Sequence, residues 1–274
     1  MPEEVEPDYK GALRIYWDII KLPFTFLMAL FGKKEKADIF APIVDFWKYF
    51  WDAKVTAIII IVNFVVFFAL LFYLGPMPNA QRTVFEKQYL LDGPANLLSL
   101  NIIPFVANWF VHFTWAHILG NMVALFILGR VVEKNFGAGK FCLIYFGSGV
   151  ISGVVDDLIH IGSMNYYANG ASGAIAGLAS AAMLIEPFYL VCLLLIPIPV
   201  FLFGWLQLYS DISGVLNPSA EGGVANFAHL GGFFAITILA FILGEEDRKK
   251  LLRGLAINIG TFLVLAAVWY FKFR

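Results

Sequence analysis

Residues 170–184 read GASGAIAGLASAAML, and this small-residue run indicates a helix that packs tightly inside a membrane bundle. Ser172 opens an apolar stretch that ends at Ile185, directly before the charged Glu186. The 14 residues from Ser172 to Ile185 give a helix of about 21 Å, shorter than a hydrocarbon core of about 30 Å. If Glu186 sits at the inner surface, Ser172 lies roughly 10 Å below the outer one. Irregular backbone at that depth must be buried in protein or line a wet cavity, so we expect a water-filled cavity around Ser172.

The composition is that of a polytopic membrane protein. Of the 274 residues, 60% are hydrophobic and only 14% are charged, with a mean hydropathy of +0.78. Soluble domains are about half apolar and about a quarter charged. The net charge of -1 argues against a nucleic-acid partner. The fold class expected is therefore an all-α membrane protein, with the lipid bilayer as its surroundings.

Seven stretches are long and apolar enough to be considered as membrane spans. They are Thr56–Leu74, His112–Val132, Lys140–Ile159, Ser172–Ile185, Phe188–Leu208, Val224–Leu243 and Leu255–Phe271. Ile19–Phe31 is apolar but shorter and follows charged residues, which favours an amphipathic helix lying on the membrane surface. We expect a cytoplasmic segment over residues 1–54, a six-helix core over 55–244, and a linker with a seventh helix over 245–274.

Loop charges predict the orientation of these spans. Cations cluster in alternate connections, which would lie on one side: Lys33, Lys34, Lys36, Lys48, Lys54, then Arg130, Lys134, Lys140, then Arg248, Lys249, Lys250 and Arg253. Positive loops are cytoplasmic. We therefore expect a multi-pass protein of the cell membrane, with its N-terminus in the cytoplasm and its C-terminus outside. In that topology His117, Ser172 and His229 all lie near the outer leaflet.

A second small-residue patch, AHLGG at residues 228–232, places a histidine in the sixth span. Ionisable groups within spans are costly and usually functional. A serine nucleophile needs a base within hydrogen-bond reach, and His229 could serve Ser172 in this way. No acidic residue lies near His229 on its own span, so a Ser–His dyad is expected rather than a triad. The alternatives are helix packing for Ser172 and an interhelical hydrogen bond for His229.

His117 and Asn121 lie four residues apart and therefore share one helix face. Both side chains can donate to a developing oxyanion. Polar contacts between helices are the alternative role.

His160 lies near two aspartates, Asp156 and Asp157, a combination that could bind a metal ion. Adjacent residues diverge by about 100° on a helix, so the two carboxylates would not converge. We therefore predict no metal site here. His112 is interpreted as structural.

Two long outer connections differ in character. The semi-apolar stretch Gly75–Val111 contains four prolines and is expected to lie along the outer leaflet. The stretch Tyr209–Gly223 is polar and rich in Gly and Ser, which predicts a mobile loop that could cover the cavity.

With these landmarks in order, the chain resembles the rhomboid family of intramembrane serine proteases. The resemblance covers about Thr56–Leu243. It rests on His117-x-x-x-Asn121, GRVVEKNFG at residues 129–137, Gly170-Ala171-Ser172-Gly173 with Gly177, and Ala228-His229-x-Gly231-Gly232. It implies a helical bundle with a rhomboid-like core that cleaves transmembrane segments of other proteins, without a cofactor.

The resemblance also implies roles for individual residues. Ser172 would be the nucleophile and His229 the base, with an oxyanion hole made by the Ser172 backbone N–H and the side chains of His117 and Asn121. Gly170, Gly173 and Gly232 would support the motifs. Members of the family often carry an aromatic residue four positions after the serine, packed on the histidine. Ala176 stands there instead, which predicts fewer contacts on His229.

Two other function classes remain open from sequence. One is a non-catalytic rhomboid-like protein that binds transmembrane segments and recruits partners. The other is a transporter with a polar site at the membrane midplane, against which stands the absence of an internal repeat in the sequence. The sequence does not define the oligomeric state.

Overall fold

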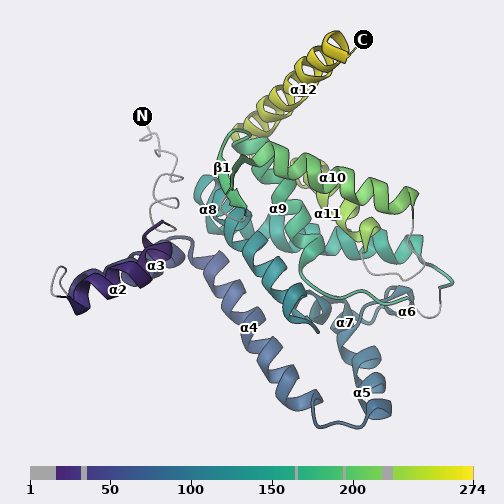
Figure 1. The fold of residues 1–274 in the computed structure, drawn as a ribbon. Coiled ribbons are helices and arrows are strands. Elements are labelled where there is room, and N and C mark those ends of the chain that lie inside the picture. Colours follow the sequence, from purple (N-terminus) through teal and green to yellow (C-terminus); the bar gives the residue numbers. More distant parts are fainter. Residues whose placement is uncertain (1–16, 32–35, 164–165, 194–195, 218–224, 274) are drawn as a thin grey trace.

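The computed structural model describes residues 17–31, 36–163, 166–193, 196–217 and 225–273, which form a helical bundle (Figure 1). The helices are α2 (Leu22–Leu30), α3 (Lys36–Trp51), α4 (Lys54–Leu74), α5 (Asn79–Phe85), α6 (Pro94–Leu98), α7 (Ile102–Ala107), α8 (Trp115–Ile159), α9 (Ser172–Ile185), α10 (Val200–Leu216), α11 (Asn226–Leu239) and α12 (Glu245–Phe273). Two strands, β1 (Leu190–Leu193) and β2 (Ile196–Pro199), form an antiparallel hairpin. The predicted helical class is confirmed.

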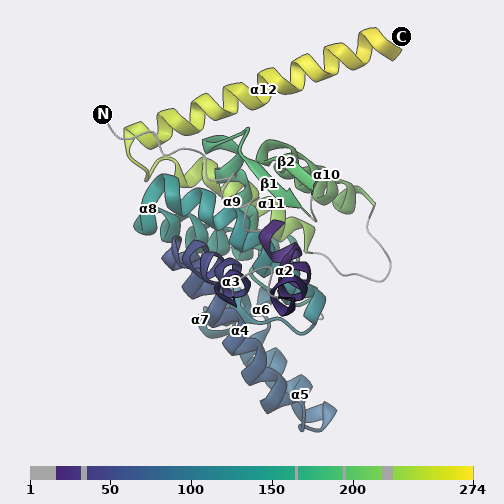
Figure 2. The same ribbon diagram turned by 60° about the vertical axis from the view of Figure 1, so that its left-hand side comes forward.

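Helix α9 is the centre of the bundle. Every residue from Gly173 to Met183 is buried. Helices α8, α10, α11 and α12 all contact α9, and α4 packs on the outside of α8. Figures 1 and 2 show α4 and α12 leaving this centre at opposite ends of the molecule. The helix with the smallest side chains is therefore the one that the other helices surround.

Glycines set how closely α9 meets its neighbours. A Cβ built on Gly173 would overlap the Ser152 side chain of α8, and one on Gly177 would overlap Ser148 one turn earlier in α8. A Cβ on Gly232 of α11 would overlap the Gly173 carbonyl oxygen. In lipid, helix association depends on such close van der Waals packing, because lipid tails are as apolar as the side chains.

The second and third expected spans form the two arms of α8. Gly137 separates them with φ 77° and ψ 166°, a conformation that breaks the regular helix. Such positive φ values suit glycine, which has no Cβ to clash with the backbone. Among the described residues, three helices are long and apolar enough to cross a membrane, namely α4, α8 and the stretch Glu245–Lys272 of α12. Helices α9, α10 and α11 are apolar but shorter.

The predicted fifth span, Phe188–Leu208, is wrong at both ends. Residues 190–199 form the β1–β2 hairpin, and α10 then runs from Val200 to Leu216. Pro197 and Pro199 lack backbone N–H groups, so a helix cannot continue through them. Pro199 instead precedes the first turn of α10.

The predicted loop Tyr209–Gly223 is also wrong over its first half. Residues 209–216 continue α10, because Ile212, Val215 and Leu216 maintain a helical apolar spacing. Residues 218–224 lie outside the described part of the chain, as do Met1–Asp8, Lys33 and Lys34.

The other outer connection, Gly75–Val111, consists of short helices. It contains α5, a π-helical turn (Glu86–Leu90), α6, α7 and a 3-10 turn (Asn108–Phe110). Leu98, Leu100 and Ile102 remain exposed on it, at 70%, 81% and 71% of their surface. Exposed apolar side chains of this kind agree with the expectation that the connection lies along the outer leaflet, which stays a prediction. The same applies to the surface helix predicted at Ile19–Phe31, where α2 lies.

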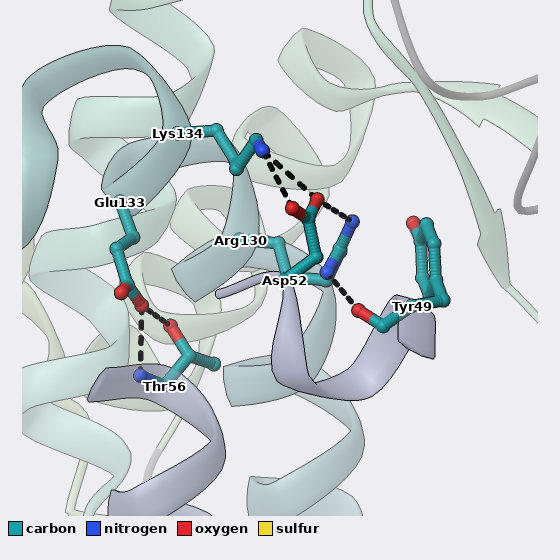
Figure 3. A network of polar contacts seen from close by, with 6 residues as sticks. All are labelled: Tyr49, Asp52, Thr56, Arg130, Glu133 and Lys134. Atoms are coloured by element: carbon teal, nitrogen blue, oxygen red, sulfur yellow. Dashed lines mark hydrogen bonds and ion pairs between the residues drawn. The ribbon is translucent and has the colours of Figure 1, made fainter. Parts of the chain in front are cut away.

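A polar network joins the start of α4 to the first arm of α8 (Figure 3). The Glu133 carboxylate accepts hydrogen bonds from the backbone N–H groups of Val55 and Thr56 at 2.9 and 2.8 Å, and from the Thr56 hydroxyl at 2.7 Å. It therefore satisfies donors that the first turn of a helix leaves free.

Beside this cap, Arg130 and Lys134 hold the chain segment that precedes α4. Both cations reach the Asp52 carboxylate, at 3.3 and 2.9 Å. The Arg130 guanidinium also lies 3.5 Å from the centre of the Tyr49 ring (Figure 3). Burial opposes ionisation of Asp52, but the two cations outweigh it and lower the pKa of that carboxyl. The ion pairs of Asp52 and the contact of Arg130 with the Tyr49 ring thus fix the chain segment that leads into α4.

The contact between α9 and α11 predicts that Gly232→Ala will destabilise the bundle. The added methyl group overlaps backbone, which cannot rotate away, so we expect the free energy of unfolding to fall by about 1–3 kcal/mol. Gly260→Ala in α12 is the matched control, because a Cβ there meets nothing within 4 Å. Thermal melting in detergent should show a clear loss for Gly232→Ala and none for Gly260→Ala. Equal melting temperatures would contradict the packing role.

Candidate active site

One cavity of about 510 Å³ brings together the four side chains that the sequence singled out. Ser172, His229, His117 and Asn121 all line it, although they come from α9, α11 and α8. Tyr166, Tyr167, Ala168 and Asn169, from the segment before α9, complete much of the wall. The cavity is thus built at the start of the short central helix.

Ser172 is the first residue of α9 and is half-buried at the cavity wall. Backbone N–H groups in the first turn of a helix have no partner within the helix, and the helix dipole makes this end positive. No hydrogen bond joins the Ser172 hydroxyl to the His229 ring among the described residues. Catalytic hydrogen bonds are often long in a ligand-free site and shorten when substrate binds.

His229 has a partner that sequence analysis missed. Its Nδ1 atom lies 2.8 Å from Oδ1 of Asp211, a residue of α10 that is only 3% exposed. No acidic residue lies near His229 on its own helix, as the sequence indicated, but Asp211 approaches its ring from α10. Asp211 lies outside the span of His229, in the stretch Tyr209–Gly223 that the sequence predicted as a loop. The apolar spacing around Asp211, which continues α10, was the signal that could have placed it on a helix.

Gly170 shapes the part of the cavity that His117 and Asn121 line. Its φ is 101°, and a Cβ built on it would lie 2.6 Å from Nε2 of His117 and 3.5 Å from Nδ2 of Asn121. Its backbone N–H donates to the Asn108 carbonyl at 2.7 Å. The chain before Ser172 therefore passes directly over the His117 and Asn121 side chains.

His112 contacts the same segment through a hydrogen bond. Its Nε2 accepts a hydrogen bond of 3.5 Å from the Ala171 backbone N–H, and its ring lies 4.8 Å from that of His117. An accepting Nε2 carries no proton, so the ring is in its neutral Nδ1–H form. The contact accords with the structural interpretation of His112.

The outer connection is fastened to the segment before Ser172. Asp92 and Ala168 exchange backbone hydrogen bonds of 3.1 and 2.8 Å. The Asp92 side chain is buried, and this burial raises its pKa to about 6, with nearby Asp156 adding to the effect. The bridge connects residues of Gly75–Val111 to the cavity wall.

His160 and Asp156 surround Tyr166 rather than converge with Asp157 on a common point. The His160 ring stacks on Tyr166 with centroids 3.5 Å apart, and the Tyr166 hydroxyl donates to Asp156 at 2.7 Å. Within the described residues no group of three or more His, Cys, Asp or Glu side chains is arranged to hold a metal ion. Both contacts instead fix a tyrosine of the cavity wall.

A helical membrane bundle in which a serine and a histidine face one cavity agrees with the rhomboid resemblance of the sequence. Comparison with known families agrees: the model described as Rhomboid domain matches residues 100–246. The chain belongs to the rhomboid family.

Individual relatives are distant. The presenilin-associated rhomboid-like protein, mitochondrial, of Mus musculus is 25% identical over 230 residues, 81% of this chain and 57% of the relative. RHOMBOID-like protein 12, mitochondrial, of Arabidopsis thaliana is 26% identical over 188 residues, 61% of this chain and 55% of the relative. Rhomboid protease AarA of Providencia stuartii is 25% identical over 243 residues, covering 78% and 81%. The chain spans little more than half the length of the first two.

These relatives contradict the expected location in the cell membrane. The mouse and Arabidopsis proteins are both named as mitochondrial. Loop charges record only which side of a bilayer a connection faces, and they do not distinguish one membrane from another. The assignment to a multi-pass membrane protein stands, whereas the assignment to the cell membrane does not.

The position of Gly170 predicts that Gly170→Ala will distort the site. Gly162 is the matched control, because its φ is also positive, at 90°, but a Cβ there meets nothing within 4 Å. Both changes strain the backbone by about 1–2 kcal/mol. Only Gly170→Ala also pushes on His117, so its melting temperature should be clearly the lower of the two. Equal losses would show that His117 does not restrict this position.

Proposed function

We propose that the chain is an intramembrane serine endopeptidase that cleaves transmembrane segments of other membrane proteins. The observation that carries the proposal is the shared cavity of Ser172, His229, His117 and Asn121. A nucleophile, a base and two hydrogen-bond donors around one space are the parts that acyl transfer requires. Membership of a family that includes a relative named Rhomboid protease AarA supports the same chemistry.

The proposed reaction uses Ser172 and His229 in two steps. His229 removes the hydroxyl proton of Ser172 while Oγ attacks the carbonyl carbon of the scissile peptide bond. The C–N bond then breaks, and His229 returns the proton to the leaving amine. In the second step His229 takes a proton from water, and the resulting hydroxide attacks the acyl-serine. The Ser172–acyl bond breaks, Oγ regains a proton, and the new carboxyl product leaves.

His117 and Asn121 are proposed to stabilise the oxyanion of each step. Asn121 is buried, and Gly170 holds the overlying backbone close to both side chains. Donors that are fixed before the reaction lose little energy in reorganising, which makes them effective at a developing charge. The Ser172 backbone N–H, at the positive end of α9, is proposed as the third donor.

The depth of Ser172 defines the substrate class in this proposal. Helix α9 has 14 residues, so it spans about 21 Å and leaves Ser172 roughly 10 Å inside the bilayer. A peptide bond at that depth belongs to a transmembrane segment. An intact helix hides its backbone, so a locally unwound segment is required, and helix-weakening Gly or Pro near the scissile bond should favour cleavage.

The alternative function is a non-catalytic rhomboid-like protein that binds transmembrane segments. The observation that favours it is the missing hydrogen bond between Ser172 and His229 among the described residues. A binding protein would need the cavity but not the proton transfer. The two proposals are separated by the reactivity of Ser172 itself.

Ser172→Ala should abolish cleavage of a transmembrane test substrate while leaving the melting temperature nearly unchanged. The change removes one oxygen from a half-buried side chain, so packing is preserved. A fluorophosphonate probe should label the unaltered protein and fail to label the variant, because the probe reacts with an activated serine. Cleavage by the variant would refute the proposed mechanism, and an unlabelled, inactive unaltered protein would favour the binding alternative.

Asn121→Ala should lower kcat by about 100- to 1000-fold, which is the typical loss on removing one oxyanion donor. KM should change little, because the interaction forms only in the transition state. Steady-state cleavage in detergent or liposomes measures both constants. If KM rises and kcat stays constant, Asn121 binds substrate instead.

A further inference from the structure

The His229 ring contacts a buried carboxylate on another helix. Nδ1 of His229 lies 2.8 Å from Oδ1 of Asp211. The Asp211 side chain is 5% exposed and the His229 side chain 17% exposed. His229 therefore has one nitrogen held inside the protein, while its ring also borders the cavity with Ser172.

We propose that Asp211 is a positioning residue for His229, so that the site functions as a Ser–His–Asp triad. This inference rests on the proposed peptidase function. The Asp211 carboxylate accepts a hydrogen bond from the Nδ1–H group of His229, which leaves the lone pair on Nε2 for the Ser172 hydroxyl. When His229 takes that proton, the carboxylate stabilises the resulting imidazolium without taking a proton itself. No atom is transferred to Asp211.

The packing of α10 on α11 holds this pair in place. A Cβ built on Gly214 of α10 would overlap the Asn226 side chain at the start of α11, so the two helices approach closely beside the pair. Ala176, one turn after Ser172, is fully buried and has only a methyl group with which to contact a neighbour. Orientation of His229 therefore depends on α10 rather than on a large side chain of α9.

The energetics of burial favour a functional role over a purely structural one. An isolated buried carboxylate is costly unless it is paired. Among the hydrogen bonds and ion pairs of the described residues, His229 is the side-chain partner of Asp211. A neutral residue could join α10 to α11 without this cost. An acid placed against the nitrogen that must stay protonated is what a general base requires.

The first experiment replaces Asp211 with asparagine, which has the same shape but no charge. In a triad the amide stabilises the wrong histidine tautomer, and the template enzyme loses about 10,000-fold in kcat. We expect Asp211→Asn to lower kcat by at least about 100-fold with KM within about threefold of the original value. Labelling of Ser172 by the fluorophosphonate probe should slow in parallel.

Asp247→Asn is the matched control. Asp247 is also a buried aspartate, 7% exposed, but its partner is Lys140 at 2.5 Å, and neither residue lines the cavity. It should keep kcat and the labelling rate even if it lowers the melting temperature. If Asp211→Asn and Asp247→Asn have equal effects on kcat, Asp211 has only a structural role.

A double-mutant cycle tests whether Asp211 acts through His229. In the His229→Ala background, Asp211→Asn should cause no further loss of Ser172 labelling, because residues that act as a unit are not additive. Losses that multiply in the double variant would overturn the proposal. An unaltered protein that neither cleaves substrate nor reacts with the probe would instead overturn the peptidase function itself, so the two failures are distinguishable.

If Asp211→Asn does not fold, the tautomer of His229 can be measured without changing Asp211. The chain has four histidines, so nitrogen NMR of histidine-labelled Ser172→Ala protein, compared with the same protein carrying His229→Gln, identifies the His229 signals. Protonation at Nδ1 with a free Nε2 is the expected result. A proton on Nε2 with Nδ1 free contradicts a hydrogen bond donated to Asp211.

Discussion

The structure depends on one steric constraint, which is the contact of α9 with α8 and α11 at backbone distance. Burial of apolar side chains gives little driving force between helices in lipid, so close packing must supply it. Gly173 and Gly232 meet where no side chain fits, and these glycines adjoin the two proposed catalytic residues. Gly173 follows Ser172, and Gly232 lies three residues after His229. The contact that holds the bundle together therefore also sets how far Ser172 lies from His229.

Much of the site could be predicted because its residues carry local signals. Ser172 and His229 each stand in a patch of small residues, and the start of α9 at Ser172 followed from the apolar run alone. The cavity followed from the shortness of that run. Loop charges placed three separate residues at one leaflet, and the structure shows them lining one space. These features depend on local composition and on the length of apolar runs, both of which can be read directly from the sequence.

The features that escaped prediction depend on partners distant in sequence or on local backbone chemistry. The contact of Asp211 with His229 was missed because it joins residues 18 positions apart, on two different helices. The β1–β2 hairpin lies within a continuous apolar run. Such a run does not distinguish a strand from a buried helix, and only its prolines argue against the helix. The Glu133 cap on Thr56 spans 77 positions and leaves no pattern in either segment alone.

The polar links between helices differ in whether one of the two partners also borders a cavity. The Glu133 carboxylate receives three hydrogen bonds at the start of α4, and Asn258 of α12 donates to the Met183 carbonyl of α9 at 2.9 Å. Both links are buried, and both fix the register of neighbouring helices. The Asp211–His229 link joins two helices as well, but one ring edge borders a cavity of about 510 Å³. These two structural links are buried, whereas a link that serves chemistry must leave one partner open to the reacting atoms. In the proposed triad, α10 therefore belongs to the site through Asp211, although no described residue of α10 lines the cavity.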